Sequence, residues 1–198
     1  MDWEQLNNRL FLAINAGAGE NQAVDGAARL VASYLPLAFI GVLIYLWLRP
    51  ESERRRAALH AGYAASLALG VNLLITLTYF HPRPFMEGLG RELIPHAPET
   101  SFPSDHSTFM LAIASRLLLD RATRWWGVFL FPLGVLGGLA RVFCGVHFPF
   151  DIAGSLVVGA ATAAALWLAR GRLTPLDKAM SRLLGLLTPR CLRPANGP

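Results

Sequence analysis

Lysine is almost absent from this chain of 198 residues, and both cysteine and charge are scarce. Lys178 is the single lysine, and the only cysteines are Cys144 and Cys191. Neither cysteine has the neighbours of a metal site, and no disulfide between them is expected because they fall near opposite ends of the hydrophobic pattern. Only 16% of the residues are charged. The polar surface that a soluble domain of this length needs is therefore missing.

Apolar residues are correspondingly abundant. They make up 54% of the chain, and the mean hydropathy is +0.40. This composition indicates an integral membrane protein. The net charge of +5 comes mostly from arginines that flank apolar segments. Because these arginines form no single patch, they indicate membrane topology and not a nucleic-acid partner.

Five apolar segments follow one another along the chain. Leu30–Leu48 and Ala57–Phe80 are long enough to cross about 30 Å of hydrocarbon. Ser107–Leu119, Trp125–Ala140 and Ile152–Ala169 are shorter. The alternative, a soluble bundle of buried helices, would need polar faces that these segments lack. We therefore predict an all-α integral membrane protein with a bundle of about five transmembrane helices.

Basic residues gather in three of the intervening regions. They lie between the first two segments (Arg49, Arg54, Arg55, Arg56), between the third and fourth (Arg121, Arg124) and after the fifth (Arg170, Arg172, Lys178, Arg182, Arg190, Arg193). The positive-inside rule makes these regions cytoplasmic. The loop 80–104 and the turn 145–151 are then expected on the outer face.

The sequence predicts a single membrane domain over residues 1–198. Helical spacing of apolar residues predicts an amphipathic outer-surface segment at 1–24 and a cytoplasmic amphipathic tail at 171–198. The transmembrane core lies between them, at 25–170. In the tail, Asp177 stands where a capping-box acid is expected.

Arg83 begins the first of three polar stretches at the predicted outer ends of the helices. It lies between Pro82 and Pro84, which stiffen the chain and stop the preceding helix. A guanidinium donates two parallel hydrogen bonds to phosphate and keeps its charge, so Arg83 is a candidate phosphate ligand. The alternative is an arginine that reaches to the lipid headgroups.

The second stretch is Pro103-Ser104-Asp105-His106, just before the third segment. Ser104 is a natural N-cap, and the first-turn N–H groups that follow can bind an anion. His106 would lie within that turn and could serve as a general acid. The alternative is an ordinary capped helix start with an incidental histidine.

Arg141, His147 and Asp151 form the third stretch. Gly145 permits a tight turn after the fourth segment, and Pro149 suits the start of the fifth. A carboxylate four residues after His147 can fix the imidazole tautomer and stabilise a cation on the ring. This spacing alone does not identify a site.

Together the three stretches resemble the motifs of the type 2 phosphatidic acid phosphatase superfamily: K-x6-R-P, P-S-G-H and S-R-x5-H-x3-D. The matching residues are Arg83, Pro84, Pro103, Ser104, His106, Arg141, His147 and Asp151. The runs F-x-H-P-R-P-F and S-F-P-S-D-H are similar to the bacitracin-resistance undecaprenyl pyrophosphate phosphatases. The resemblance extends over roughly residues 25 to 170.

Three positions depart from these motifs. Thr76 stands in place of the lysine, Asp105 in place of the glycine and Ala140 in place of the serine. Phosphate binding is then assigned to Arg83, Arg141 and the backbone near Ser104, with Arg91 as a further candidate. Asp105 is included among the predicted phosphate-binding residues. Its expected partner is either a basic residue, Arg91 or Arg141, or the ring of His106. For a second phosphate the candidates are His81, His96, Arg91 and Glu99, although loop hydrogen bonds explain each equally well.

The resemblance implies a phosphatase that uses no metal and no cofactor. His147 would attack the terminal phosphorus, Asp151 would orient it, and His106 would protonate the leaving lipid phosphate. The expected substrate is undecaprenyl diphosphate, a polyprenyl diphosphate, at the outer face of the bacterial cytoplasmic membrane. Membrane lipids are the other expected partners, and no nucleic acid is expected. Two alternatives stay open: a phosphatase of phosphatidylglycerol phosphate, phosphatidic acid or lipid A phosphate, and a non-catalytic lipid-phosphate transporter.

Overall fold

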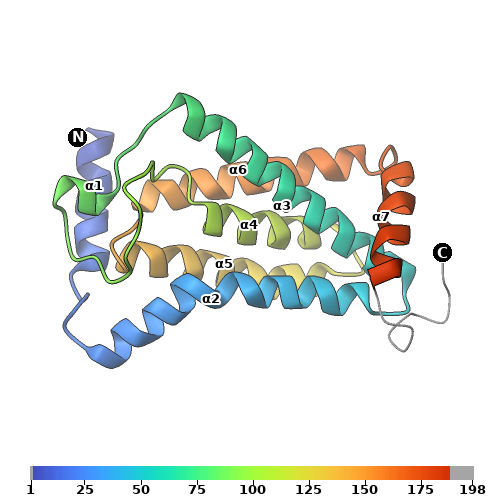
Figure 1. Cartoon of the computed structure of the whole chain (residues 1–198), viewed down its shortest axis with the longest axis horizontal. Coiled ribbons are helices and arrows are strands. Elements are labelled where there is room, and N and C mark those ends of the chain that lie inside the picture. Colours follow the sequence, from blue (N-terminus) through green and yellow to red (C-terminus); the bar gives the residue numbers. More distant parts are fainter. Residues whose placement is uncertain (1, 188–198) are drawn as a thin grey trace.

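The structure, a computed structural model, describes residues 2–187 and is all-α over that range (Figure 1). Its seven α-helices and one short 3-10 helix are α1 (Trp3–Asn15), α2 (Gln22–Trp47), α3 (Ser52–Thr78), η1 (Pro84–Glu87), α4 (Asp105–Leu119), α5 (Arg124–Phe143), α6 (Pro149–Ala169) and α7 (Thr174–Leu187). Arg190, Arg193 and Cys191, which entered the topology and disulfide predictions, lie outside the described residues.

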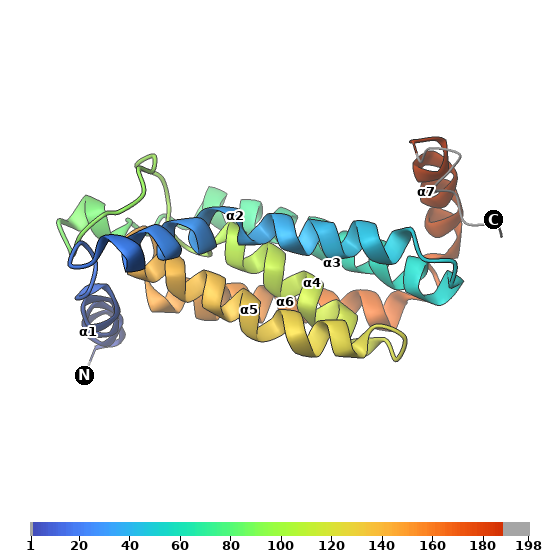
Figure 2. The same cartoon turned by 90° about the horizontal axis from the view of Figure 1, so that it is seen from below.

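Five helices, α2 to α6, run lengthwise and form a bundle, while α1 and α7 lie across its two ends (Figures 1 and 2). α4 is the central helix and packs against α3, α5 and α6. Its side chains from Met110 to Leu117 are all buried. A short helix surrounded on all sides therefore forms the axis of the bundle.

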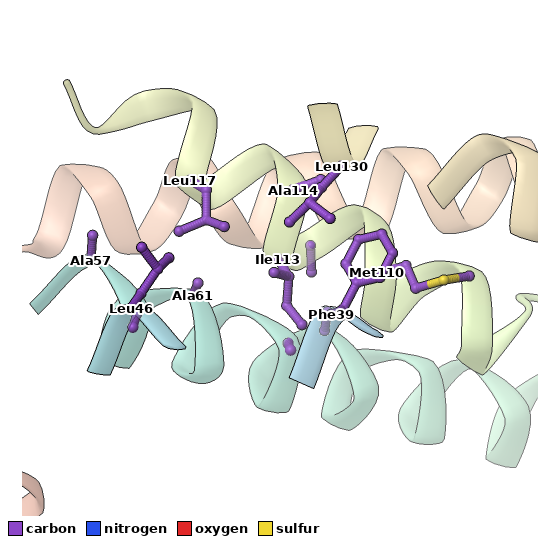
Figure 3. Packing of buried hydrophobic residues seen from close by; sticks show 13 residues of the cluster. Phe39, Leu46, Ala57, Ala61, Met110, Ile113, Ala114, Leu117 and Leu130 are labelled. Carbon is purple, nitrogen blue, oxygen red and sulfur yellow. The ribbon is translucent and has the colours of Figure 1, made fainter. Parts of the chain in front are cut away.

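The largest apolar cluster joins α4 to the helices around it (Figure 3). Met110, Ile113 and Leu117 of α4 meet Phe39 and Leu46 of α2 there. α3 contributes mostly buried alanines, which let its backbone approach α4 closely. Gly159 of α6 serves the same purpose, since a Cβ at this position would lie only 2.8 Å from the backbone nitrogen of Ala112.

Four of the helices, α2, α3, α5 and α6, are long and apolar enough to cross a membrane. This confirms a membrane protein with several candidate spans. α4 has only 15 residues, in agreement with the short third segment of the prediction. α2 begins at Gln22, three residues before the predicted start of the transmembrane core at residue 25. Asn21 starts it by accepting hydrogen bonds from the backbone nitrogens of Ala23 and Val24.

Helix α1 is attached to its end of the bundle through polar residues. Asn7, Phe11 and Asn15 are the buried side chains of α1, and Asn15 binds the backbone of Arg91 and Phe143. Trp3 faces outward with 76% of its surface exposed. This pattern agrees with an amphipathic helix lying on the end of the bundle.

At the other end of the bundle, the capping role predicted for Asp177 is wrong. Both of its carboxylate oxygens lie 3.0–3.1 Å from Nε2 of the buried His60 of α3. The side chain thus attaches α7 to the bundle. The arginine-rich connections α2–α3, α4–α5 and α6–α7 all lie at this end, opposite α1 (Figure 1).

Candidate active site

All three predicted polar stretches come together at the α1 end of the bundle. Arg83 of the α3–α4 loop contacts His147 of the α5–α6 turn. Ser155 of α6 donates a hydrogen bond of 3.0 Å to the backbone oxygen of Ser104, which joins the start of α4 to the first turns of α6. Arg83 and His147, which are 64 positions apart in the sequence, therefore belong to one polar cluster.

His147 is held between a carboxylate and a guanidinium. Its Nδ1 lies 3.3 Å from Oδ2 of Asp151, and its Nε2 lies 3.3 Å from Nη1 of Arg83. A guanidinium can only donate, so Nε2 carries the lone pair and Nδ1 carries the proton. Asp151 is the third residue of α6, and its Oδ2 also accepts from the backbone nitrogen of Phe148. The carboxylate is thereby fixed by the helix start that it caps.

A tight turn brings His147 to this position. Gly145 ends the turn after α5 with φ +81, where a side chain would strain the backbone. A Cβ there would also lie 2.3 Å from the backbone oxygen of Arg91. The prediction of a glycine-dependent turn is confirmed. Nearby, Leu93 donates to the backbone oxygen of Cys144, so the α3–α4 loop is attached to the same turn.

Arg83 is buried although it carries a charge. Only 4% of its surface is exposed. Its Nη1 donates to the backbone oxygen of Val146 at 2.8 Å, and its Nη2 donates to Glu99 and to the backbone oxygen of Thr100. These contacts fix the plane of the guanidinium beside His147. An arginine reaching out to the headgroups would be exposed, so that alternative is wrong.

Arg141 is the second buried guanidinium of the cluster, with 4% of its surface exposed. Its Nη1 donates to the backbone oxygen of Ala32 in α2 at 3.2 Å. Within residues 2–187 it forms no ion pair with a carboxylate. A buried cation without an anionic partner is a strong anion-binding group.

Ser104 occupies the N-cap position of α4, as predicted, but its side chain caps no backbone N–H. Its Oγ instead accepts from Oγ of Ser107. The first-turn amides of α4 are therefore not occupied by a capping side chain, which leaves them available to an anion. His106 follows in the same turn and is half-buried. Arg141, Arg83 and Asp105 are among the charged groups that act on its ring.

Asp105 has a partner that the sequence analysis did not consider. Its Oδ1 accepts a hydrogen bond of 2.7 Å from Nδ2 of the buried Asn72 in α3. Asn72 also binds Thr108. Arg91, one of the two basic partners suggested for Asp105, instead donates to Glu20 and to the backbone oxygen of Ala18. Asp105 is thus tied to α3, and the signal for this was a single asparagine in an apolar segment.

The positions that depart from the motifs carry no replacement cation. Oγ1 of Thr76 donates to the backbone oxygen of Leu73 within α3. Ala140 packs against Ala32 and Cys144 in a small apolar cluster. The cationic groups described at this site are therefore arginines.

Burial sets the electrostatics of the cluster. It lowers the pKa of His147 to about 4, although the hydrogen bond that the ring donates to Asp151 opposes the shift. Burial also lowers the pKa of Arg83, against the carboxylates of Glu99, Asp151 and Asp105. His147 is consequently neutral at physiological pH, with a lone pair on Nε2. A neutral imidazole beside two guanidinium groups is suited to attack on a bound phosphoryl group.

The sequence profile of the PAP2 superfamily matches residues 57–175. The chain belongs to this family. It is 38% identical over 153 residues to undecaprenyl-diphosphatase BcrC of Bacillus subtilis (strain 168), covering 77% of this chain and 78% of that protein. It is 32% identical over 171 residues to the putative undecaprenyl-diphosphatase YbjG of Escherichia coli (strain K12), covering 85% and 86%. Among solved structures it resembles Aquifex aeolicus LpxE, with a TM-score of 0.68, 25% identity and coverage of 81% and 93%.

Membership confirms the family that the motifs indicated. The chain is an undecaprenyl-diphosphatase-like PAP2 lipid phosphatase with several candidate membrane spans. The alternative of a non-catalytic transporter is therefore dropped. Residues that sequence reasoning missed are Asn72, Ser155 and the contact of Glu99 with Arg83.

Proposed function

We propose that this PAP2 phosphatase removes the terminal phosphate of undecaprenyl diphosphate through a phosphohistidine on His147. The observation that carries the proposal is the double contact of the His147 ring. Asp151 holds the protonated Nδ1, and the lone pair of Nε2 lies beside Arg83. One nitrogen is therefore oriented by the carboxylate, and the lone pair of the other becomes available as a nucleophile once the Arg83 guanidinium donates to the phosphate instead.

The phosphate would bind among three kinds of donor. Arg83 and Arg141 supply guanidinium groups, and the first turn of α4 after Ser104 supplies backbone N–H groups. All are buried or fixed before the substrate binds. Donors arranged in advance around a transferring phosphoryl group stabilise the charge on its equatorial oxygens, which is the main term in phosphoryl transfer.

The reaction then takes two displacements. Nε2 of His147 attacks the terminal phosphorus, the bond to the bridging oxygen breaks, and His106 donates a proton to the departing lipid monophosphate. Water next attacks the phosphohistidine while His106 takes up a proton, the P–N bond breaks, and inorganic phosphate leaves. The Asp151 carboxylate balances the positive charge that His147 carries between the two steps.

A lipid substrate fits the position of the site at one end of the bundle. Aromatic side chains are exposed near both ends of the bundle: Trp3, Tyr79 and Phe80 on the side of the site, and Tyr45 and Trp125 on the other. Such side chains concentrate where a membrane meets water. α4 then crosses the bilayer inside the ring of longer helices as a fifth transmembrane helix. With the arginine-rich connections in the cytoplasm, the site faces outward from the bacterial cytoplasmic membrane.

The test is phosphate release by the purified protein from undecaprenyl diphosphate, compared with phosphatidylglycerol phosphate, phosphatidic acid and lipid A phosphate. We expect the highest kcat/KM for the prenyl diphosphate. Rapid quenching with substrate labelled in its terminal phosphate should trap an acid-labile phosphoryl group on the protein. Higher kcat/KM on another lipid would refute the substrate, and labelling of a His147→Ala variant would refute the nucleophile.

The same assay tests the absence of a metal step. Activity should be unchanged in excess chelator, because the arginines supply the positive charge that a metal ion would otherwise bring. Loss of activity that a divalent ion restores would contradict the mechanism.

A further inference from the structure

One oxygen of Asp151 is left without a hydrogen bond. The side chain is fully buried, and Oδ2 serves both the His147 ring and the backbone of Phe148. Oδ1 has no hydrogen-bond partner among the residues that the structure describes. A buried carboxylate oxygen without a donor is costly and marks a place where a donor is needed.

The ring of His81 lies next to that oxygen. Its Nδ1 is 3.7 Å from Oδ1 of Asp151 and 2.8 Å from Oγ of Ser101. The ring also packs edge-on against Phe148, with 5.3 Å between the ring centroids. Its backbone is fixed on both sides, because the His81 nitrogen donates to Thr100 and its oxygen accepts from the Ser101 nitrogen.

A separate cavity reaches His81 and Asp151 from the surface. It has a volume of about 470 Å³ and is lined by Asp2, Trp3, Glu4, Asn7, Tyr79, His81, Phe102, Phe150 and Asp151. None of His147, Arg83 and Arg141 lines it. It is therefore distinct from the place where a phosphate contacts the guanidinium groups. His81 and Asp151 lie side by side in the wall of this cavity.

We propose that His81 is a positioning residue for the phosphatase reaction. Its Nδ1–H, shared with Ser101, holds Oδ1 of Asp151 and keeps Oδ2 directed at His147. Closing the 3.7 Å separation to hydrogen-bond distance needs only a shift of about 1 Å. The carboxylate is then fixed at both oxygens when His147 becomes positively charged. This inference rests on the role proposed above for Asp151.

A different role for His81 makes a different kinetic prediction. If His81 instead bound the second phosphate of the substrate, its loss would raise KM for a diphosphate and spare a lipid monophosphate. A residue that positions Asp151 should lower kcat on both substrates and leave KM nearly unchanged, because the effect falls on the chemical step.

The experiment compares His81→Ala, His81→Asn and the parent on undecaprenyl diphosphate and phosphatidic acid. We expect kcat of His81→Ala to fall by about 100-fold on both, as for a nucleophile displaced by about 1 Å. Asparagine retains an N–H donor close to the Nδ1 position and should restore most of the activity. Trp3→Leu, which changes the cavity wall without touching Asp151, should match the parent.

A double-mutant cycle tests whether His81 acts through Asp151. In an Asp151→Asn background, His81→Ala should add less than about a twofold loss, because residues of one unit are not additive. An equal loss in both backgrounds, a change in KM alone, or no loss in His81→Ala would overturn the inference. Tryptophan fluorescence checks folding, and the Asn variant covers the case in which Ala fails to fold. A parent without activity on any lipid phosphate would instead overturn the proposed function.

Discussion

The molecule contains two buried clusters that combine a histidine, an aspartate and an arginine, one at each end of the bundle. At the α7 end, Arg116 donates to Asp120 at 2.6 Å and to Nδ1 of His60 at 2.9 Å. His60 in turn contacts Asp177. At the α1 end, Arg141 reaches only the backbone oxygen of Ala32 among the described residues.

The difference lies in how the positive charge is balanced. At the α7 end a carboxylate already pairs with the guanidinium, so the cluster is complete and joins α3, α4 and α7. At the α1 end the only ion pair of Arg83 or Arg141 among residues 2–187 joins Arg83 to Glu99, which is 60% exposed. Similar residue types thus form a structural link in one place and, in the function proposed above, an anion-binding site in the other.

The strongest test of this difference is to replace the histidine of each cluster by glutamine. Glutamine retains a polar amide but cannot act as the nucleophile. His147→Gln should lower phosphate release by about 10,000-fold or more, and His60→Gln should change it by less than about threefold. Steady-state phosphate release from undecaprenyl diphosphate measures both. Equal losses in the two variants would show that the clusters do not differ in function.

Replacing the arginine of each cluster should likewise affect activity at one end and stability at the other, with smaller effects on activity than the histidine variants. Arg141→Ala removes a transition-state cation and should lower kcat/KM by about 100- to 1,000-fold. Arg116→Met leaves Asp120 and His60 without their buried partner and should lower the free energy of unfolding by about 3 kcal/mol. Phosphate release and thermal unfolding in detergent, measured on both variants, give a two-by-two comparison. A large activity loss with unchanged stability in Arg116→Met would contradict it.

The sequence indicated which residues of the candidate site lie close together, but not the contacts that hold them. Arg83, His106, Arg141, His147 and Asp151 were placed together because motif spacing and helix ends carry that information. The contacts that complete the site were not predictable. Asn72 to Asp105 and Ser155 to Ser104 join residues 33 and 51 positions apart, and no local pattern indicates them.

The helix boundaries failed for a physical reason as well. Hydropathy finds where apolar residues are dense, but α2 begins at Gln22, after its cap Asn21 and eight residues before the predicted segment. Asp177 was misread for the same reason, since its spacing fits a local cap while a buried histidine 117 positions away binds its carboxylate. Local signals identify helices, and tertiary partners decide where polar side chains go.

The pH dependence of activity tests the protonation state of His147 in the cluster at the α1 end. Burial lowers the pKa of His147 to about 4, and the nucleophile must be neutral. Activity should therefore persist as pH falls below 6.5 and be lost near pH 4, seen as the acid limb of kcat/KM. Because Asp151 opposes the shift, Asp151→Asn should move that limb to still lower pH. An acid limb at or above pH 6.5 would show that His147 is not held neutral.

The smallest expected effect concerns the lysine that the family motif has and the cluster at the α1 end lacks. Thr76→Lys places an ammonium where the family motif has lysine, and a further positive charge should lower KM for the diphosphate by about two- to fivefold. Thr78→Lys adds the same charge two residues away and is the control, since its side chain lies on another face of α3. KM values of the two variants at low and high salt would separate a specific contact from general attraction. Equal KM changes in both would mean that position 76 does not face the phosphate, so that the two arginines alone suffice.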